Sequence, residues 1–234
     1  MDTDNPTLYI VASPIGNLAD ITLRALDVLK SVDLVVAEDT RVTQKLLRYY
    51  GVQKPMRSIR ERSSARRVDL LVSEMSAGRW PKVAYLSDAG TPGISDPGGR
   101  LAAAARASGI TVEPVPGPSA LTALLQVAGV PLGNGFLFLG YLPKKKGRQT
   151  LLSKLRDNRW PVVIFERGNR IAKTLAQFEE IYGSDTLAVV GREMTKKFEE
   201  IKTFRLAGLG NIVLSIKGEF SILVVPTNKK INHK

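Results

Sequence analysis

Short apolar segments that alternate with helical patterns constrain the fold of this 234-residue chain more than any other feature. In the first half, four such segments predict strands near residues 8–12, 32–37, 83–87 and 110–115. Helices are predicted to begin near Asp20, Thr40, Ser64 and Pro97. A βαβα order requires a parallel sheet with right-handed crossovers. The first half therefore predicts an α/β domain, in which Asp20 caps the first helix and Ser63 or Ser64 caps the third.

The second half predicts another α/β domain with a mixed sheet. Its strands are expected near residues 136–140, 161–165, 186–191, 201–204 and 219–225, and its longer helices near 148–157 and 169–182. No helical pattern separates the last two strands, which predicts an antiparallel hairpin. The proline-rich residues 115–118 predict a stiff connector between domains at residues 1–115 and 119–234, followed by a small-residue helix through Ala128. Residues 227–234 are expected to be disordered.

Two polar loops follow buried strands of the first domain. Residues 87–97 are rich in Gly, Pro, Ser and Asp, and residues 13–17 form a second Gly-containing loop before a helix. Ligands of open α/β sheets bind at the carboxyl ends of the strands, so both loops are expected to border one binding crevice. The alternative for the longer loop is a plain turn that ends in an Asp96 cap.

Six segments together resemble the tetrapyrrole methylase superfamily, in order and spacing, over roughly Thr7 to Val225. They are residues 13–17, 37–41, 83–97, 116–120, 192–199 and 218–219. Within that superfamily they are most similar to the branch that methylates the 2′-oxygen of a cytidine ribose in small-subunit (16S) ribosomal RNA. The resemblance implies two α/β domains with a cofactor cleft between them, and a homodimer. The apolar residues 121–142 could supply part of a dimer interface or could simply be core.

The resemblance implies S-adenosylmethionine as the cofactor. The chain has neither a Gly-x-Gly-x-x-Gly turn nor a Walker loop, so the usual dinucleotide and nucleoside triphosphate signatures are absent. The implied cofactor-binding residues are Pro14, Ser87, Asp88, Ala89, Gly90, Pro92, Ser119, Ala120, Leu139, Phe165 and Val189. The last three would line an adenine pocket, and each could equally be ordinary core.

Methylation of a ribose hydroxyl needs a group that takes its proton or stabilises the developing alkoxide. Candidates near the expected crevice are Asp39, Arg41, Asp88, Glu166, Arg170 and Glu193. The segment at 165–170 resembles a family pattern that ends in His-Arg, but Asn169 stands where His is usual, and Asn cannot take up a proton. For Glu166, Arg170, Arg192 and Glu193, the alternative is a surface or domain-interface ion pair.

The charge of the chain favours a polyanionic partner. Its net charge is +12, and residues 1–118 carry +2 of this while residues 119–234 carry +10. Two exposed-looking clusters are candidate RNA contacts, comprising Arg60, Arg62, Arg66 and Arg67 and the run Lys144, Lys145 and Lys146. The family has a histidine-rich stretch where residues 59–63 lie here. The alternative is that these clusters are solvated surface that keeps the protein soluble.

Composition excludes several classes of protein. The chain has no Cys and one His, His233, which argues against disulfides and metal sites. No apolar stretch is long enough to span a membrane and the start does not read as a signal peptide, so a cytoplasmic protein is expected. Three functions remain open: a methyltransferase of small-subunit rRNA or the small ribosomal subunit, a methyltransferase of a tetrapyrrole or other small metabolite, and an RNA-binding module without catalysis.

Overall fold

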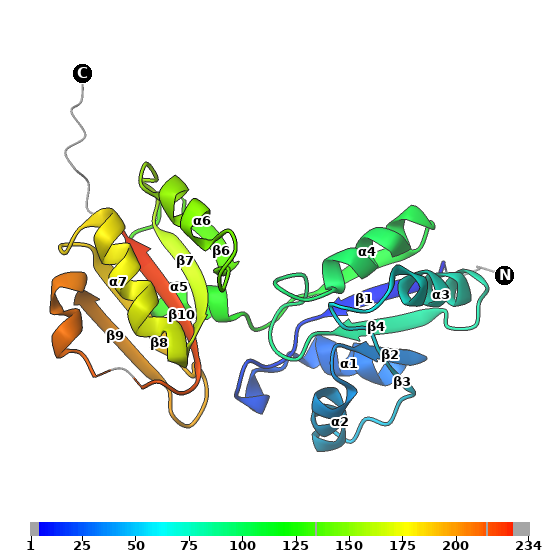
Figure 1. The fold of residues 1–234 in the computed structure, drawn as a ribbon. Coiled ribbons are helices and arrows are strands. Elements are labelled where there is room, and N and C mark those ends of the chain that lie inside the picture. The colour runs from blue at the N-terminus through cyan, green and yellow to red at the C-terminus, as the bar shows by residue number, and fades with distance from the viewer. Residues whose placement is uncertain (1–4, 134, 214, 227–234) are drawn as a thin grey trace. The chain divides into compact units, whose positions relative to one another are not determined.

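The chain folds into two compact units, residues 1–119 and 120–234. The structure, a computed structural model, describes residues 5–133, 135–213 and 215–226 (Figure 1). Residues 227–234, which were expected to be disordered and include His233, lie outside the described residues. Each unit contains one sheet and its own apolar core.

The sheet of the first unit is parallel throughout, as the βαβα order predicted. Its strands are β1 (Thr7–Val11), β2 (Leu34–Ala37), β3 (Met56–Ser58), β4 (Lys82–Leu86) and β5 (Thr111–Val115). They lie in the order β3-β2-β4-β1-β5. Only β3 was missed in the sequence, because Met56, Arg57 and Ser58 are half-buried edge residues without an apolar run.

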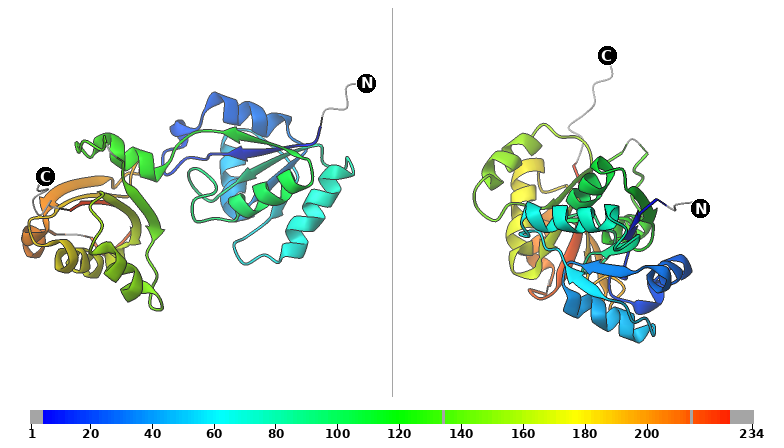
Figure 2. Two further views of the ribbon diagram at one scale, coloured as in Figure 1. Left: turned by 90° about the horizontal axis from the view of Figure 1, so that it is seen from above. Right: turned by 90° about the vertical axis from the view of Figure 1, so that its right-hand side faces the viewer.

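Helices cover both faces of this sheet (Figures 1 and 2). They are α1 (Leu23–Ser31), α2 (Thr40–Tyr49), α3 (Ala65–Ser76) and α4 (Gly98–Ala107). Residues of α1 and α2 form one core with alternate strand residues, and residues of α3 and α4 form the other with the remaining strand residues. This alternation explains why the central strands are apolar on both faces.

The caps of α1 and α3 differ from the prediction. The Ala25 N–H donates to Thr22 Oγ1 at 3.1 Å, so Thr22, not Asp20, caps α1. Asp20 instead ends a short 3₁₀ helix (Leu18–Asp20) that precedes α1. Ser64 occupies the cap position of α3 without a side-chain cap bond, and Ser63 Oγ accepts the Arg60 N–H at 2.9 Å.

Strand β5 is an edge of the parallel sheet and contains a proline. Pro114 pairs in register with Ile10 of β1. Its carbonyl accepts a hydrogen bond from the Arg24 side chain of α1, and this bond is not part of the hydrogen-bond ladder of the sheet. A proline has no N–H and is tolerated in a sheet mainly at such an edge.

The sheet of the second unit is mixed, as expected. Its strands are β6 (Leu137–Tyr141), β7 (Val162–Arg167), β8 (Leu187–Arg192), β9 (Glu200–Arg205) and β10 (Glu219–Val225). Their order is β6-β7-β10-β8-β9, with β6 and β7 parallel and the other pairs antiparallel. The predicted hairpin of the last two strands is wrong, because β9 pairs with β8 and β10 lies between β7 and β8. Strand β10 is buried along most of its length, whereas β9 alternates like an edge strand.

Helices of the second unit are α5 (Ala120–Val127), α6 (Arg148–Leu155) and α7 (Ile171–Tyr182). The core lies between α6, α7 and one face of the sheet (Figure 1). On the other face Leu124 of α5 packs near Gly191 of β8. Short 3₁₀ helices occupy Gly168–Arg170 and Leu206–Asn211. Within the described part of the chain, no helix has the length and apolar character needed to cross a membrane.

Candidate functional site

A pocket of about 310 Å³ lies in the first unit at the carboxyl ends of β1 and β4. Its walls come from the loops after these strands and from α2. The lining residues are Ser13, Pro14, Gly16, Leu18, Val42, Thr43, Lys45, Leu46, Tyr49, Ser87 and Asp88. The two loops meet as expected, because Ser13 and Gly90 exchange two backbone hydrogen bonds of 3.0 Å. Both loops therefore border one pocket of the first unit.

The loop at residues 87–97 is held in one shape by Asp96. Its carboxylate accepts the N–H groups of Gly93 at 2.7 Å, Ile94 at 3.0 Å and Gly98 at 2.7 Å. The Tyr85 hydroxyl at 3.2 Å ties the same carboxylate to β4. Gly90 has a φ of +77°, which favours glycine. Asp96 therefore does more than cap α4. It fixes the shape of the loop whose first residues, Ser87 and Asp88, line the pocket.

The pocket has an apolar side and a polar side. Val42, Leu46 and Tyr49 contribute apolar surface from α2, and the loops contribute the hydroxyls and the Asp88 carboxylate. The Thr43 hydroxyl is buried and has no hydrogen-bond partner among the described residues. An apolar wall with a few convergent polar groups is typical of a small-molecule site. The α2 residues of the pocket were not predicted from the sequence, because a helical pattern does not show which face of the helix will lie against the loops.

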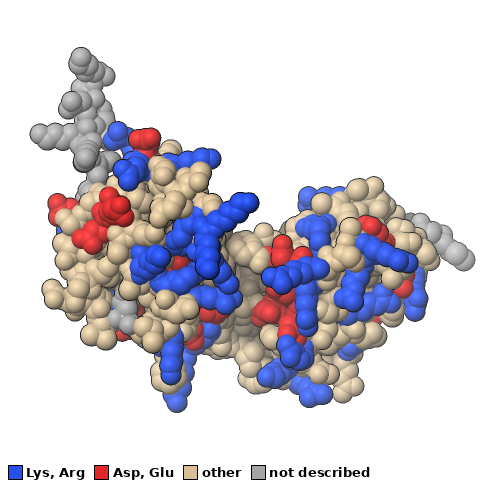
Figure 3. Space-filling view, in the orientation of Figure 1, with Lys and Arg blue, Asp and Glu red and all other residues tan. Residues whose placement is uncertain are grey.

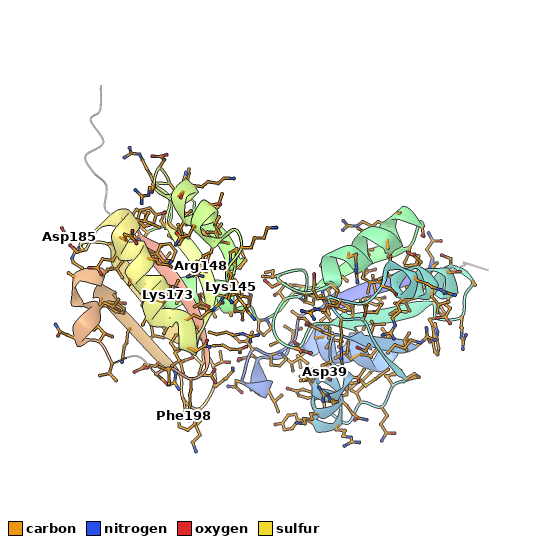
Figure 4. The ribbon with its side chains drawn as sticks, viewed as in Figure 1. Asp39, Lys145, Arg148, Lys173, Asp185 and Phe198 are labelled. Carbon is orange, nitrogen blue, oxygen red and sulfur yellow. The ribbon has the colours of Figure 1, made fainter. Side chains whose placement is uncertain are left out.

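Acidic residues gather beside this pocket, at the ends of β2 and β4. The Asp39 N–H donates to Asp88 Oδ1 at 2.9 Å. Asp39 caps α2 and binds the Arg41 guanidinium at 2.5 Å, and these hydrogen bonds lower the pKa of Asp39 (Figure 4). Burial raises the pKa of Glu38, and the nearby Asp88 raises it further. Glu38 is thus better suited than Asp39 to take up a proton. Glu38 was not among the candidates predicted from the sequence.

A charge-removing substitution at Glu38 is expected to stabilise the protein at neutral pH. Because the folded-state pKa is raised, the stability linked to this group is complete at acidic pH and is lost as the pH rises through that pKa. Glu38→Gln should therefore have a higher Tm than the parent at pH 7, and the difference should vanish below about pH 4. Thermal unfolding across pH measures it, with the exposed Glu180→Gln as control. An unchanged or lower Tm of Glu38→Gln at pH 7 would contradict the assignment.

Glu166 and Arg170, both predicted near the chemistry, belong to a buried network of the second unit. The Glu166 carboxylate is fully buried and binds Arg170 at 2.5 Å and the Thr174 hydroxyl at 2.8 Å. Arg148 lies 3.9 Å from Glu166 and donates to Thr174 at 2.8 Å. The network joins β7 to α6 and α7. Its partners occupy the carboxylate, which favours the alternative of a structural ion pair.

The Glu193 carboxylate also has hydrogen-bond and ion-pair partners within the second unit. Its carboxylate accepts the Glu219 N–H at 2.8 Å and binds Lys196 at 3.2 Å. Burial by itself would raise the pKa of Glu193, but the hydrogen bonds from Glu219 and Lys196 outweigh it and lower the pKa. A carboxylate held in its charged form is a weak proton acceptor.

The proposed adenine contacts do not share one surface. Phe165 and Val189 lie on the sheet face opposite α6 and α7, where Phe165 packs 5.1 Å from the Phe138 ring. Leu139 instead packs against the core on the helix-covered face. Ser119 and Ala120 fall on either side of the boundary between the two units. Ala89 and Pro92 lie in the loop that Asp96 holds.

Both basic clusters are exposed, and they belong to different units. Arg60, Arg62, Arg66 and Arg67 lie on and before the first turn of α3, and Lys144, Lys145 and Lys146 lie before α6. Arg148, four residues after Lys144, is buried (Figure 4). Basic side chains are also prominent over α6 and the lower part of α7, whereas acidic side chains lie over the upper end of α7 (Figure 3). Among the described residues no group of His, Cys, Asp and Glu side chains could hold a metal ion.

Comparisons with known proteins agree with this architecture. The family model for tetrapyrrole (corrin/porphyrin) methylases matches residues 7–210. A ribosomal RNA small subunit methyltransferase I from Thermotoga maritima is 47% identical over 193 residues, which cover 82% of this chain and 85% of that protein. The protein of the same name from Mesorhizobium japonicum is 43% identical over 229 residues, covering 96% of this chain and 77% of that protein.

Solved structures show the same fold at lower sequence identity. Diphthine synthase has a TM-score of 0.72 at 16% identity, with 94% of this chain and 90% of that chain covered. A uroporphyrin-III C-methyltransferase from Thermus thermophilus has a TM-score of 0.63 at 20% identity, with 93% and 94% covered. The matched family model spans most of the chain, and the relatives exceed 40% identity. This chain therefore belongs to the tetrapyrrole methylase family and is a methyltransferase.

Proposed function

We propose that this protein uses S-adenosylmethionine to methylate the 2′-oxygen of a cytidine ribose in small-subunit (16S) rRNA. The observation that carries the proposal is the identity of 43% and 47% to relatives named ribosomal RNA small subunit methyltransferase I, over most of the chain. The excess of positive charge in residues 119–234 supports a polyanionic substrate. Exposed Arg60, Arg62, Arg66, Arg67, Lys144, Lys145 and Lys146 are the proposed phosphate contacts.

The loops of the first unit fit the polar parts of this cofactor. S-adenosylmethionine supplies an electrophilic methyl group on a sulfonium cation when it is bound. Oxygen atoms of Ser87 and Asp88 can stabilise a nearby cation, and backbone N–H groups of a Gly-containing loop can satisfy a ligand carboxylate. Pro14, Ala89, Gly90 and Pro92 complete the proposed loop contacts. In the second unit, Phe165 and Val189 remain proposed contacts for adenine, because both lie on the sheet face opposite α6 and α7.

The acidic cluster beside the pocket can manage the proton of the ribose hydroxyl. As the 2′-oxygen forms its bond to the methyl carbon, the hydroxyl proton must pass to a base, and Glu38 and Asp88 are the proposed acceptors. The raised pKa of Glu38 makes its carboxylate a better proton acceptor than an ordinary glutamate side chain. Arg41, fixed beside Asp39, supplies a positive charge next to the same cluster. Alignment of the two reacting groups is expected to provide most of the rate enhancement.

Replacement of the pocket carboxylate tests this proposal. Asp88→Asn is expected to lower methyl transfer by about a hundredfold or more, the usual contribution of a positioned acid or base together with its orientation effect. Transfer of labelled methyl to isolated small subunits and to bare 16S rRNA is measured, and the modified nucleotide is mapped by mass. The matched control is Asp27→Asn, an exposed carboxylate on α1 that does not line the pocket.

Three results would overturn the proposed function or its site. Full activity of Asp88→Asn would remove the pocket from the chemistry. Methylation of a nucleobase rather than a ribose would change the reaction. Transfer to a tetrapyrrole such as a uroporphyrinogen, with none to RNA, would favour the small-metabolite methyltransferase instead.

A further inference from the structure

The loop between β8 and β9, residues 193–199, carries backbone strain at two non-glycine positions. Glu193 has a φ of +47° and Thr195 a φ of +64°, in the left-handed region that side chains disfavour. Each such residue costs about 1 kcal/mol or more, and it persists only where its surroundings hold it. Strain of this kind often marks a segment whose shape is needed for function.

Several contacts hold the β8–β9 loop in this shape. Lys196 binds both Glu193 at 3.2 Å and Glu219 at 3.1 Å, and these carboxylates raise the pKa of Lys196 against the effect of burial. Arg192 donates to the Lys217 carbonyl at 3.0 Å and to the Phe198 carbonyl at 3.3 Å. The loop is therefore tied both to itself and to the segment that precedes β10.

This fixed loop presents an aromatic ring to solvent. Phe198 is 65% exposed and lies in the β8–β9 loop, at the lower end of the second unit in Figure 4. The Lys197 ammonium lies 5.7 Å from the centre of the Phe198 ring. Within the described chain Lys197 has no carboxylate partner, in contrast to Lys196. An exposed phenylalanine on an ordered loop is unfavourable in water, so a bound partner would recover its hydrophobic contribution.

We propose that the β8–β9 loop is a contact for single-stranded RNA, in which Phe198 stacks on an unpaired base and Lys197 neutralises a neighbouring phosphate. This inference rests on the proposed function. Single-stranded RNA is bound through aromatic stacking combined with basic side chains along the backbone, and both elements occur here side by side. A ring beside a free cation suits a base and its phosphate better than an apolar protein surface, for which the ammonium would be desolvated.

Substitutions at Phe198 test the stacking contact. Phe198→Ala is expected to weaken binding of an unstructured RNA oligonucleotide, and of small subunits, by about ten- to a hundredfold, the range for loss of one base–aromatic stack. Phe198→Trp should retain the affinity, whereas Phe198→Leu should lose it. Lys197→Ala should lower the slope of log affinity against log salt by about 0.7. Leu23→Ala, an exposed apolar residue at the start of α1, is the matched control.

The outcomes separate this inference from the proposed function. If the parent protein methylates small-subunit RNA but Phe198→Ala binds RNA as tightly as the parent, the inference is overturned alone. If Phe198→Leu matches the parent, the contact is merely apolar and stacking is overturned. If Phe198→Ala changes the molecular mass in light scattering, the loop is a contact with a second copy, which also overturns it. If the parent neither binds nor methylates RNA, both fail. Tm measurements should show every variant folded, because Phe198 is exposed.

Discussion

Replacing Gly168 by alanine is expected to destabilise the second unit by about 3 kcal/mol or more, because a new methyl group would meet backbone atoms. The added Cβ would clash with the carbonyl oxygen and carbonyl carbon of Ile216 and would lie 2.8 Å from the Lys217 nitrogen. The Gly168 N–H also donates to the Gly218 carbonyl at 3.1 Å, so relief of the clash breaks this bond. Denaturant unfolding measures the loss.

The control for this substitution is Gly208→Ala. A Cβ at Gly208 would meet nothing within 4 Å, so its effect should stay within about 0.5 kcal/mol of the parent. RNA affinity should also fall in Gly168→Ala, since Lys217 holds Arg192 and thereby the β8–β9 loop. Equal stability of Gly168→Ala and Gly208→Ala would contradict the close approach of the chain at this position.

Removal of the Glu166 carboxylate is expected to destabilise the protein by about 3 to 5 kcal/mol, the range for breaking a buried ion pair on one side. Glu166→Ala leaves Arg170, bound at 2.5 Å, and the buried Arg148 without their shared negative partner. It also removes the acceptor of the Thr174 hydroxyl. Unfolding free energies of the variant and parent, measured by denaturant titration, test this expectation.

Two further variants show whether charge is the cause. Thr174→Val removes hydrogen bonds without leaving a charge unpaired, and should cost only about 1 to 2 kcal/mol. The double variant Glu166→Leu with Arg170→Met should recover part of the stability lost in Glu166→Ala, because the charge of Arg170 is removed together with its partner and only Arg148 still lacks the carboxylate. A loss in Glu166→Ala no larger than in Thr174→Val would contradict the ion-pair role.

The strand and helix order of this protein could be predicted from its sequence, but not every pairing. Runs such as residues 83–86 are apolar on both faces, which is typical of strands in a parallel sheet covered by helices on both sides. The hairpin was inferred from adjacency in sequence, although β10 is buried on both faces and therefore reads as a central strand. The alternation of β9 carries the opposite signal, that of an edge strand. Burial pattern was the better guide to pairing than the absence of an intervening helix.

The candidate site could be predicted only in part. The meeting of the two loops follows from parallel strands, whose carboxyl ends share one edge of the sheet. The pKa of Glu38 depends on burial and on Asp88, which follows it by fifty positions, so no local pattern reveals it. The burial of Glu166 could have been predicted, since its place in the strand alternation puts it on the same inward face of β7 as Val162 and Ile164. The prediction of Glu166 as a candidate near the expected crevice did not use that alternation.

Pro114 has a consequence for how copies of this chain can associate. A second chain that paired with the free side of β5 would need N–H donors and carbonyl acceptors along that side. Pro114 provides neither, because proline has no N–H and its carbonyl already accepts a hydrogen bond from Arg24. Addition of a foreign strand there is therefore blocked at the middle of the edge. Fibril-like growth from the parallel sheet is disfavoured at β5, so a specific assembly of this protein must use side-chain surfaces or another edge.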